Sequence, residues 1–268
     1  MKRYLVLYLL ITLYSCLDGK AQYVFGTTGL LHMPTAEMQQ DKTLLFGGSF
    51  LDISSTPDHW GYGTFNYYIN ITIFPWLEVG YTCTLHKGEK GWPEQTWGKF
   101  VNQDRQFSGR LRILKEGQLW KYMPAVVLGA NDPSTNDAMG NPEKDDYGIT
   151  GVNAIGNGHW NRYYCAFTKH FVLKNIGKLG THLAYVYNKR LDYHLNGPAV
   201  GANFRFQFSE TSFINKAVNG LNMMAEYDSR TINCGFEYSF WKDYINAVVE
   251  LNQCRYFSGG LIFKVHLK

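Results

Sequence analysis

The sequence predicts an all-β fold, a single antiparallel transmembrane β-barrel of about twelve strands, with fourteen as the next choice. Composition is the first observation: 16% of the 268 residues are aromatic and 27 are glycine, against only 8 prolines. Such a composition favours strands and turns over helices. The second observation is a set of segments that alternate between apolar and polar residues with period two, and the third is that tryptophan lies at their ends.

Charge excludes several classes of function. Charged residues make up 18% of the chain, the formal net charge is +4, and no run of basic residues is present. A nucleic-acid partner is therefore not expected. With 45% hydrophobic residues the chain is also expected to fold rather than to remain disordered.

Residues 1–21 have the pattern of a signal peptide. Lys2 and Arg3 precede an apolar stretch, and Gly19-Lys20-Ala21 places small residues at the two positions that signal peptidase recognises. Cleavage before Gln22 is favoured over lipidation at Cys16, because the bulky Tyr14 fits a lipoprotein signal poorly.

The mature chain, residues 22–268, is expected to be one barrel domain, with residues 22–43 leading into the first long strand. Beyond residue 21 no stretch approaches the roughly 18 consecutive apolar residues of a transmembrane helix, so any crossing of a membrane would use strands.

Thirteen segments alternate with period two. They are residues 44–51, 63–74, 77–85, 107–115, 124–130, 147–153, 162–172, 181–188, 200–209, 221–228, 232–241, 245–251 and 261–268. Bacterial single-chain barrels have an even number of strands. Either one of these segments is not a strand, which gives twelve, or residues 23–31 add a fourteenth.

The last segments separate apolar from polar residues most clearly. In the four segments 200–209, 221–228, 232–241 and 261–268, one face is apolar or aromatic throughout, and the other is polar except for Met224, Trp241 and Ile262. The predicted lumen-lining residues are Arg205, Glu226, Asp228, Glu237, Glu250 and Lys264. Alternation alone also fits a soluble barrel or sandwich. The tryptophans at strand ends and the grouping of charges on one face favour a lipid-facing apolar surface.

Turn lengths are uneven. Tight reversals are expected at residues 74–76, 229–230 and 242–243, whereas residues 87–105 and 131–146 are expected to be long loops. Because outer-membrane barrels carry their long loops on the extracellular side, we expect both loops to lie outside. The second loop is acidic, but it lacks the ligand spacing of an EF-hand and is expected to be solvated.

The sequence offers little chemistry. No histidine has serine two residues on, and the G-x-S-x-G, H-E-x-x-H and P-loop motifs are absent. Paired-carboxylate catalysis among Glu226, Asp228, Glu237 and Glu250 is conceivable, but these groups are expected instead to form an electrostatic ladder with Arg205 and Lys264. The sequence therefore predicts no catalytic residue, no metal site and no cofactor. The four cysteines after the signal are expected to be small hydrophobic residues rather than disulfides, and they contain no C-x-x-C.

Residues 26–38 carry a recognisable motif. The pattern G-L-x-x-M-P-T-A, with Gly29, Met33, Pro34, Thr35 and Ala36, resembles the opening of the YjbH family of bacterial outer-membrane proteins associated with exopolysaccharide synthesis and export. Residues 111–129 and 219–228 resemble the family further on. Residues 256–268 resemble its short members from Bacteroidetes-type bacteria, so this chain is expected to be a single-barrel version.

The resemblance implies an outer-membrane location and a link to surface polysaccharide, and it supplies no catalytic residue. The expected function is to assist polysaccharide secretion or display without catalysis. The expected partners are outer-membrane lipid, polysaccharide and periplasmic export components. The alternatives are a structural or adhesion barrel that presents its loops, and then an enzyme that modifies lipid or glycan. Residues 26–38 are expected to form a bend into the first strand, folded across the periplasmic mouth, or a contact surface for a periplasmic partner.

Overall fold

The protein is described here by a computed structural model that covers residues 25–57, 60–88, 93–133, 160–188, 195–209 and 211–267. The predicted signal peptide with Cys16, the predicted strand at 147–153 and most of the acidic loop at 131–146 lie outside the described residues.

The described residues form twelve strands. They are β1 (Thr43–Leu51), β2 (Thr64–Phe74), β3 (Leu77–Lys87), β4 (Phe100–Leu114), β5 (Ala125–Asn131), β6 (Arg162–Leu173), β7 (Gly177–Tyr187), β8 (Gly197–Phe206), β9 (Leu221–Tyr227), β10 (Ile232–Phe240), β11 (Ile245–Asn252) and β12 (Tyr256–His266). A helix, α2 (Phe213–Asn219), and three short 3-10 helices, η1 (Ile53–Ser55), η2 (Glu94–Thr96) and η3 (Trp241–Asp243), lie in the connections.

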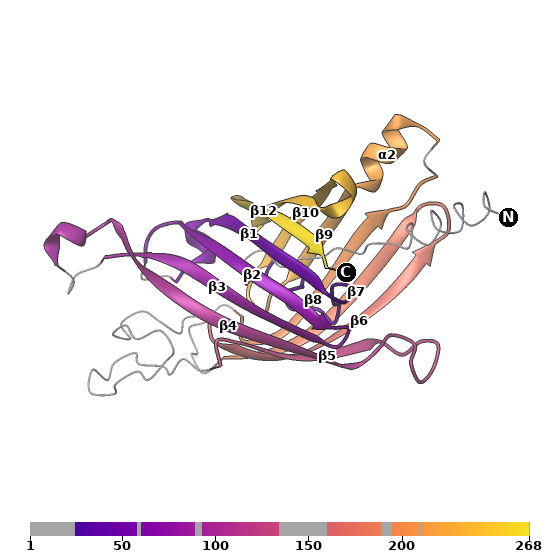
Figure 1. Ribbon diagram of the computed structural model, residues 1–268, viewed down its shortest axis with the longest axis horizontal. Helices are drawn as coiled ribbons and strands as arrows, with labels where there is room; N and C mark the ends of the chain where they lie inside the picture. The colour runs from indigo at the N-terminus through magenta and orange to yellow at the C-terminus, as the bar shows by residue number, and fades with distance from the viewer. Residues whose placement is uncertain are drawn as a thin grey trace.

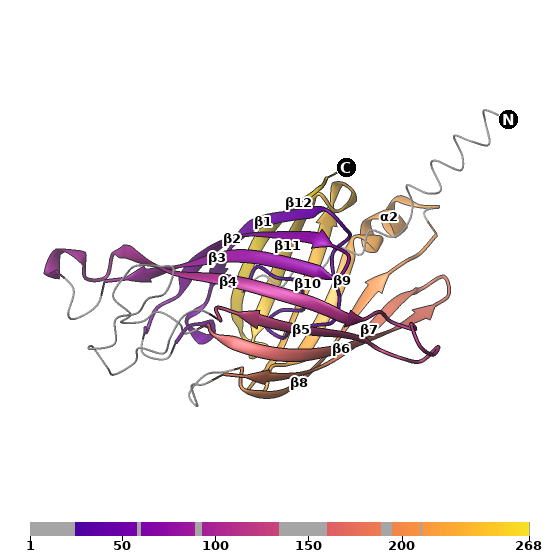
Figure 2. The ribbon, with the colours of Figure 1, turned by 60° about the horizontal axis from the view of Figure 1, so that its bottom comes forward.

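The strands form a closed antiparallel barrel in which every strand pairs with its neighbours along the chain (Figures 1 and 2). Closure is made by β1 and β12, with Thr43 opposite His266 and Phe50 opposite Gly259. The prediction of a twelve-stranded all-β barrel is confirmed, and the alternative of fourteen strands is wrong. Residues 25–31, part of the candidate fourteenth strand, do not join the wall.

Two strands begin well before their predicted starts. β4 begins at Phe100 rather than at 107, so the predicted loop at 87–105 is shorter than expected. In this part of β4 the outward side chains Gln103 and Arg105 are polar, which conceals a strand from any search for an apolar face. β12 begins at Tyr256 rather than at 261. The prediction started too late because Gly259 and Gly260 interrupt the alternation of apolar and polar residues.

The burial of the apolar and polar strand faces shows which face of the wall points outward. None of the residues on the predicted apolar face of segments 200–209, 221–228, 232–241 and 261–268 is buried, whereas Asn203, Asn222, Asn233, Glu237 and Lys264 on the opposite face all are. The apolar face therefore points outward and the polar face lines the lumen. A water-soluble barrel would have the opposite arrangement.

The antiparallel order sorts the connections between two ends. The turn end carries the β2–β3, β4–β5, β6–β7, β8–β9 and β10–β11 connections, together with both ends of the wall. The loop end carries the other six connections, including the β3–β4 and β5–β6 connections, where the two long loops were predicted. Those loops share one end, as expected. The tight turn at 229–230 also lies there, so turn length does not separate the two ends strictly.

Tryptophans follow the interfacial expectation only in part. Trp76, Trp97, Trp120 and Trp241 are exposed near strand ends. Trp60 and Trp160 are instead buried. Trp160 packs edge-on against Phe25, with ring centroids 5.6 Å apart, so it belongs to the interior of the barrel and not to an aromatic girdle. Among the described residues, no helix has the length and apolar character needed to cross a membrane.

Candidate functional site: the N-terminal segment inside the barrel

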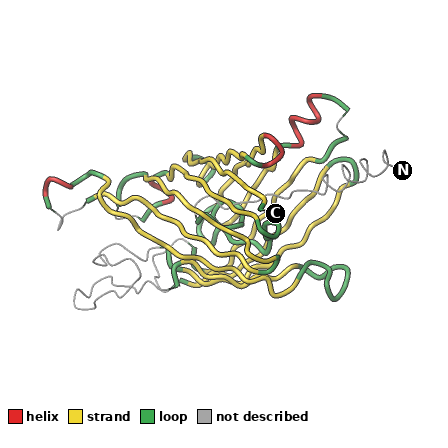
Figure 3. The backbone as a smooth tube through the Cα atoms, viewed as in Figure 1, coloured by secondary structure: helices red, strands yellow, loops and turns green. Residues whose placement is uncertain are grey.

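Residues 25–39, which we call the plug, lie inside the lumen and not across its mouth. All of them except the half-buried Met38 are buried, and they contact β3, β4, β6 and β9 around the wall. In Figure 3 their loop trace lies among the strands. The expectation that this segment bends across the periplasmic mouth is therefore corrected.

The plug folds back on itself. Gly29 and Pro34 form an antiparallel bridge, and the Leu30 amide donates to the Met33 carbonyl at 3.2 Å. Pro34 fixes its own backbone and favours an extended Met33, which suits the return arm. Gly26 has φ +63, and a Cβ at this position would lie 2.5 Å from Tyr68, so only glycine fits.

The wall makes room for the plug with small inward residues. Ala125, Val127, Ala166, Ala184, Val186 and Ala199 share one buried apolar cluster with Phe25, Leu30, Leu31 and Met33. Gly201 on β8 leaves space for the plug, because a Cβ there would lie 2.6 Å from Leu30 Cδ1 and 2.7 Å from Met33 Sδ. Met224 and Ile262, two of the apolar exceptions on the polar face, belong to the same cluster.

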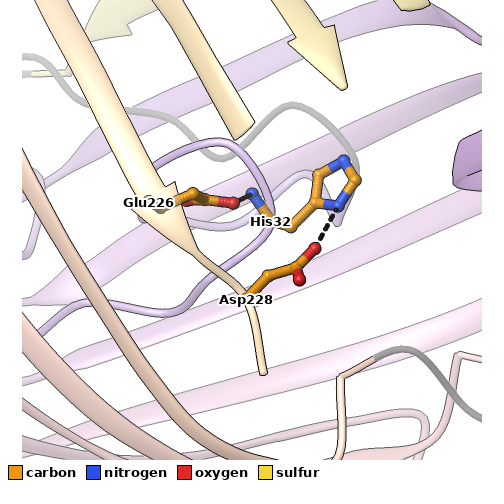
Figure 4. Close-up of side chains that lie close together, drawn as sticks. All are labelled: His32, Glu226 and Asp228. Carbon is orange, nitrogen blue, oxygen red and sulfur yellow. Dashed lines mark hydrogen bonds and ion pairs between the residues drawn. The ribbon is translucent and has the colours of Figure 1, made fainter. Parts of the chain in front are cut away.

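Glu226 on β9 binds the tip of the plug through the backbone. Its carboxylate accepts hydrogen bonds from the amides of Leu31 at 3.0 Å, His32 at 2.7 Å and Met33 at 3.3 Å. Figure 4 shows the carboxylate directed at the His32 amide. Three backbone donors satisfy the charge of a carboxylate that water cannot reach.

The side chain of His32 lies between two further carboxylates. Its Nδ1 is 3.3 Å from Asp228 Oδ2, and its Nε2 is 3.0 Å from Glu250 Oε1. Burial alone would raise the pKa of Asp228, which follows the last residue of β9. Hydrogen bonds from His32, the Thr231 amide and Asn233 outweigh that effect and lower the pKa to about 2.

Two arginines and a glutamate hold the two arms of the plug, which are residues 25–30 before its tip and residues 34–39 after it. Glu78 accepts from the Thr28 amide at 2.8 Å and the Thr28 hydroxyl at 2.6 Å. Arg110 donates to Glu78 at 2.9 Å and to the carbonyls of Thr35 and Glu37 at 2.5 and 2.9 Å. Arg162 donates to the His32 carbonyl at 2.8 Å and stacks on the Phe25 ring, 3.3 Å from its centroid.

The exit of the plug is fastened near the turn end. The two ring nitrogens of His170 lie 2.6 Å from carboxylate oxygens of Glu37 and Glu116. Burial alone would raise the pKa of Glu116, but hydrogen bonds from the side chain and amide of His170 and from Lys169 lower it below its ordinary value.

All six predicted lumen-lining residues lie on the inner side of the wall. Arg205 and Lys264 each lie 3.6 Å from Glu237, which is one of the four carboxylates of the predicted ladder. Glu226, Asp228 and Glu250 do something that the sequence did not predict, since they contact the plug. Sequence reasoning also missed Glu78, Arg110, Arg162 and His170.

The motif residues all belong to the plug. Gly29 and Pro34 are its bridge partners, Met33 is buried, the Thr35 carbonyl accepts from Arg110, and the Ala36 amide donates to Thr168 Oγ1 at 2.8 Å. The G-L-x-x-M-P-T-A motif is thus in the part of the chain that lies inside the lumen.

Residues 21–136 match the model of the YjbH family, described as exopolysaccharide biosynthesis protein YbjH. The resemblance to the YjbH family is confirmed. The matched region of this YjbH-like chain covers the plug and the strands from β1 to β5, so it includes Glu78 and Arg110 as well as the motif. No curated protein matches the chain.

Proposed function

We propose that the protein is an outer-membrane barrel that assists exopolysaccharide secretion or display without catalysing a reaction, and that its lumen is closed by the plug. The match to the YjbH family supports the link to exopolysaccharide. The outward apolar wall supports the membrane location, because it would be exposed to water anywhere else.

The observation that carries the choice between scaffold and conduit is the depth at which the plug is buried. Phe25, Leu30, Leu31 and Met33 are each no more than 1% exposed. Burial of such a side chain stabilises by about 1.5–3 kcal/mol, so removal of all four costs roughly 6–12 kcal/mol. Spontaneous opening would then occur in about one molecule in 10⁴ to 10⁹. This favours a closed scaffold or partner of the export machinery over a standing pore.

A second candidate is a conduit from which the plug is withdrawn by a partner. It is favoured by the topology, since β1 pairs with β12 and the wall closes without the plug. For both candidates, the contacts of the lumen carboxylates bear on whether the protein is an enzyme. Glu78 and Glu226 already accept hydrogen bonds from the plug, which supports a non-catalytic role for them.

A disulfide between plug and wall separates the two candidates. Ala36 and Thr168 are neighbours, with the Ala36 amide 2.8 Å from Thr168 Oγ1, so Ala36→Cys with Thr168→Cys is the cysteine pair to introduce, and disulfide formation is checked on non-reducing gels. The double variant would be expressed in a deletion strain, with each single variant as a control, and secreted exopolysaccharide would be measured. For a scaffold we expect normal secretion with the disulfide formed.

Loss of secretion that a reductant reverses, in the double variant alone, would identify a conduit. A deletion strain with normal exopolysaccharide would contradict the proposed function altogether. If that strain instead lost attachment to surfaces, the adhesion barrel would become the better hypothesis.

A further inference from the structure

The two histidines that join plug and wall differ in their geometry. Both ring nitrogens of His170 lie 2.6 Å from a carboxylate, the short distance of charge-assisted hydrogen bonds. His32 Nδ1 is 3.3 Å from Asp228 Oδ2, which is longer than such bonds usually are. The contact between His32 and Asp228 is therefore the looser of the two.

A distance of 3.3 Å fits the hydrogen bond described above, and it also equals the separation of two ligands on one metal ion. Zinc binds imidazole nitrogen and carboxylate oxygen at about 2.0–2.2 Å, which puts neighbouring ligands of a tetrahedron roughly 3.3–3.5 Å apart. One ligand atom from each of His32, Glu226 and Asp228 lies within 4.8 Å of the others. Figure 4 shows the His32 ring facing the Asp228 carboxylate beside Glu226. Asp228 Oδ2 also accepts from Asn233 Nδ2 at 2.9 Å, and both Glu226 oxygens accept from plug amides, so a metal ion would share these oxygens with their donors.

Glu250 depends on His32 for a charged partner among the described residues. Its side chain is fully buried, neither of its oxygens accepts a hydrogen bond, and Oε1 faces His32 Nε2 at 3.0 Å. Buried carboxylates are normally paired or bound to metal. When Nδ1 of a histidine binds a metal, its Nε2 proton usually points at just such a carboxylate.

We propose that His32, Glu226 and Asp228 bind one divalent metal ion of the zinc class, with Glu250 orienting His32. Imidazole with carboxylates suits zinc. The ion joins the tip of the plug to β9 and offsets the excess of carboxylates. The sequence predicted no metal site, because His32 lies 194 and 196 positions from Glu226 and Asp228 and no local pattern connects it to them. The inference goes beyond the proposed function and does not depend on it.

Metal content tests the proposal directly. The full chain, without a histidine tag, would be purified from membranes, treated with EDTA and equilibrated with zinc chloride, and bound zinc would be measured by atomic absorption. We expect one zinc ion per barrel, and a rise in the unfolding temperature that saturates at that ratio.

Variants locate the ion. His32→Gln and Asp228→Asn should abolish zinc binding, and Glu250→Gln should weaken it by about 10–100-fold. Glu116→Gln, which alters the other histidine contact between plug and wall at His170, should bind zinc as the wild type does. Heat-modifiable mobility on gels identifies the folded variants. Absence of zinc from the wild type would overturn the proposal, as would zinc binding that survives in folded His32→Gln and Asp228→Asn.

Discussion

Arg110 joins both arms of the plug to the wall. Its guanidinium reaches Glu78, which holds Thr28, and the carbonyls of Thr35 and Glu37. The planar guanidinium can make these contacts together, whereas the single ammonium of lysine cannot.

We expect Arg110→Lys to lower the free energy of unfolding by about 2–4 kcal/mol, because hydrogen bonds to a charged group contribute about 1.5–3 kcal/mol each. Urea unfolding in lipid vesicles measures this. Arg105→Lys is the matched control, since Arg105 is exposed on the same strand. Equal stability of the two variants would show that Arg110 does not hold the plug.

Glu116 gives the plug contacts a defined dependence on pH. Its pKa is lowered in the folded protein, so its contribution to stability is present above its ordinary pKa of 4.5. That contribution is lost as the pH falls through the lower folded value. The unfolding temperature of the wild type should therefore decrease more on acidification from about pH 6 to about pH 3 than that of Glu116→Gln.

The exposed Glu94 on η2 supplies the control for this experiment, because Glu94→Gln changes the same chemical group without a plug contact. Wild type and Glu94→Gln should show the same acid response. If Glu116→Gln responds to acid just as they do, the bond between Glu116 and His170 does not stabilise the fold.

At the scale of elements, the plug and the wall are separate structures, and this can be tested by removing the plug. Replacement of residues 25–39 by a glycine-serine linker of equal length should leave the β1–β12 closure intact. The small wall residues that faced the plug would then border an open lumen. We expect the wild type to be silent in planar bilayers and the variant to conduct ions.

The control for this variant is an equivalent linker in place of α2, which lies in the β8–β9 connection at the turn end. It should remain silent. Both proteins must first show the heat-modifiable mobility of folded barrels. A folded plug deletion that stays silent would mean that other residues close the lumen.

The sequence predicted the wall far better than the plug, and the reason is physical. A strand between lipid and lumen must alternate, so β9 and β10 were predicted almost to the residue. The plug has no such period, because it contacts polar and apolar wall residues on all sides. Its partner Glu226 lies 194 positions from His32, and local patterns cannot reveal a pair so far apart.

A weaker signal for the plug was nevertheless present. Ala166, Ala184 and Val186 point inward on β6 and β7, where a lumen filled with water would favour polar residues. Small apolar residues on the inner face of a barrel indicate that something apolar fills it. The motif at 26–38, with its adjacent leucines, was the available candidate.

At the scale of the whole molecule, outward apolar side chains distinguish a membrane barrel from a soluble one, and two leucines test this. Leu183 lies in the middle of β7 and is 53% exposed, and Leu119 lies in the β4–β5 connection and is 67% exposed. A soluble protein would tolerate arginine at either position, because both side chains would already be in water. In a bilayer, arginine near the midplane costs about 2–4 kcal/mol and arginine near an interface about 0–1 kcal/mol. We therefore expect Leu183→Arg, and not Leu119→Arg, to lower the free energy of unfolding in vesicles by that larger amount. Equal tolerance of the two substitutions would place the wall in water and would remove the basis for an outer-membrane role.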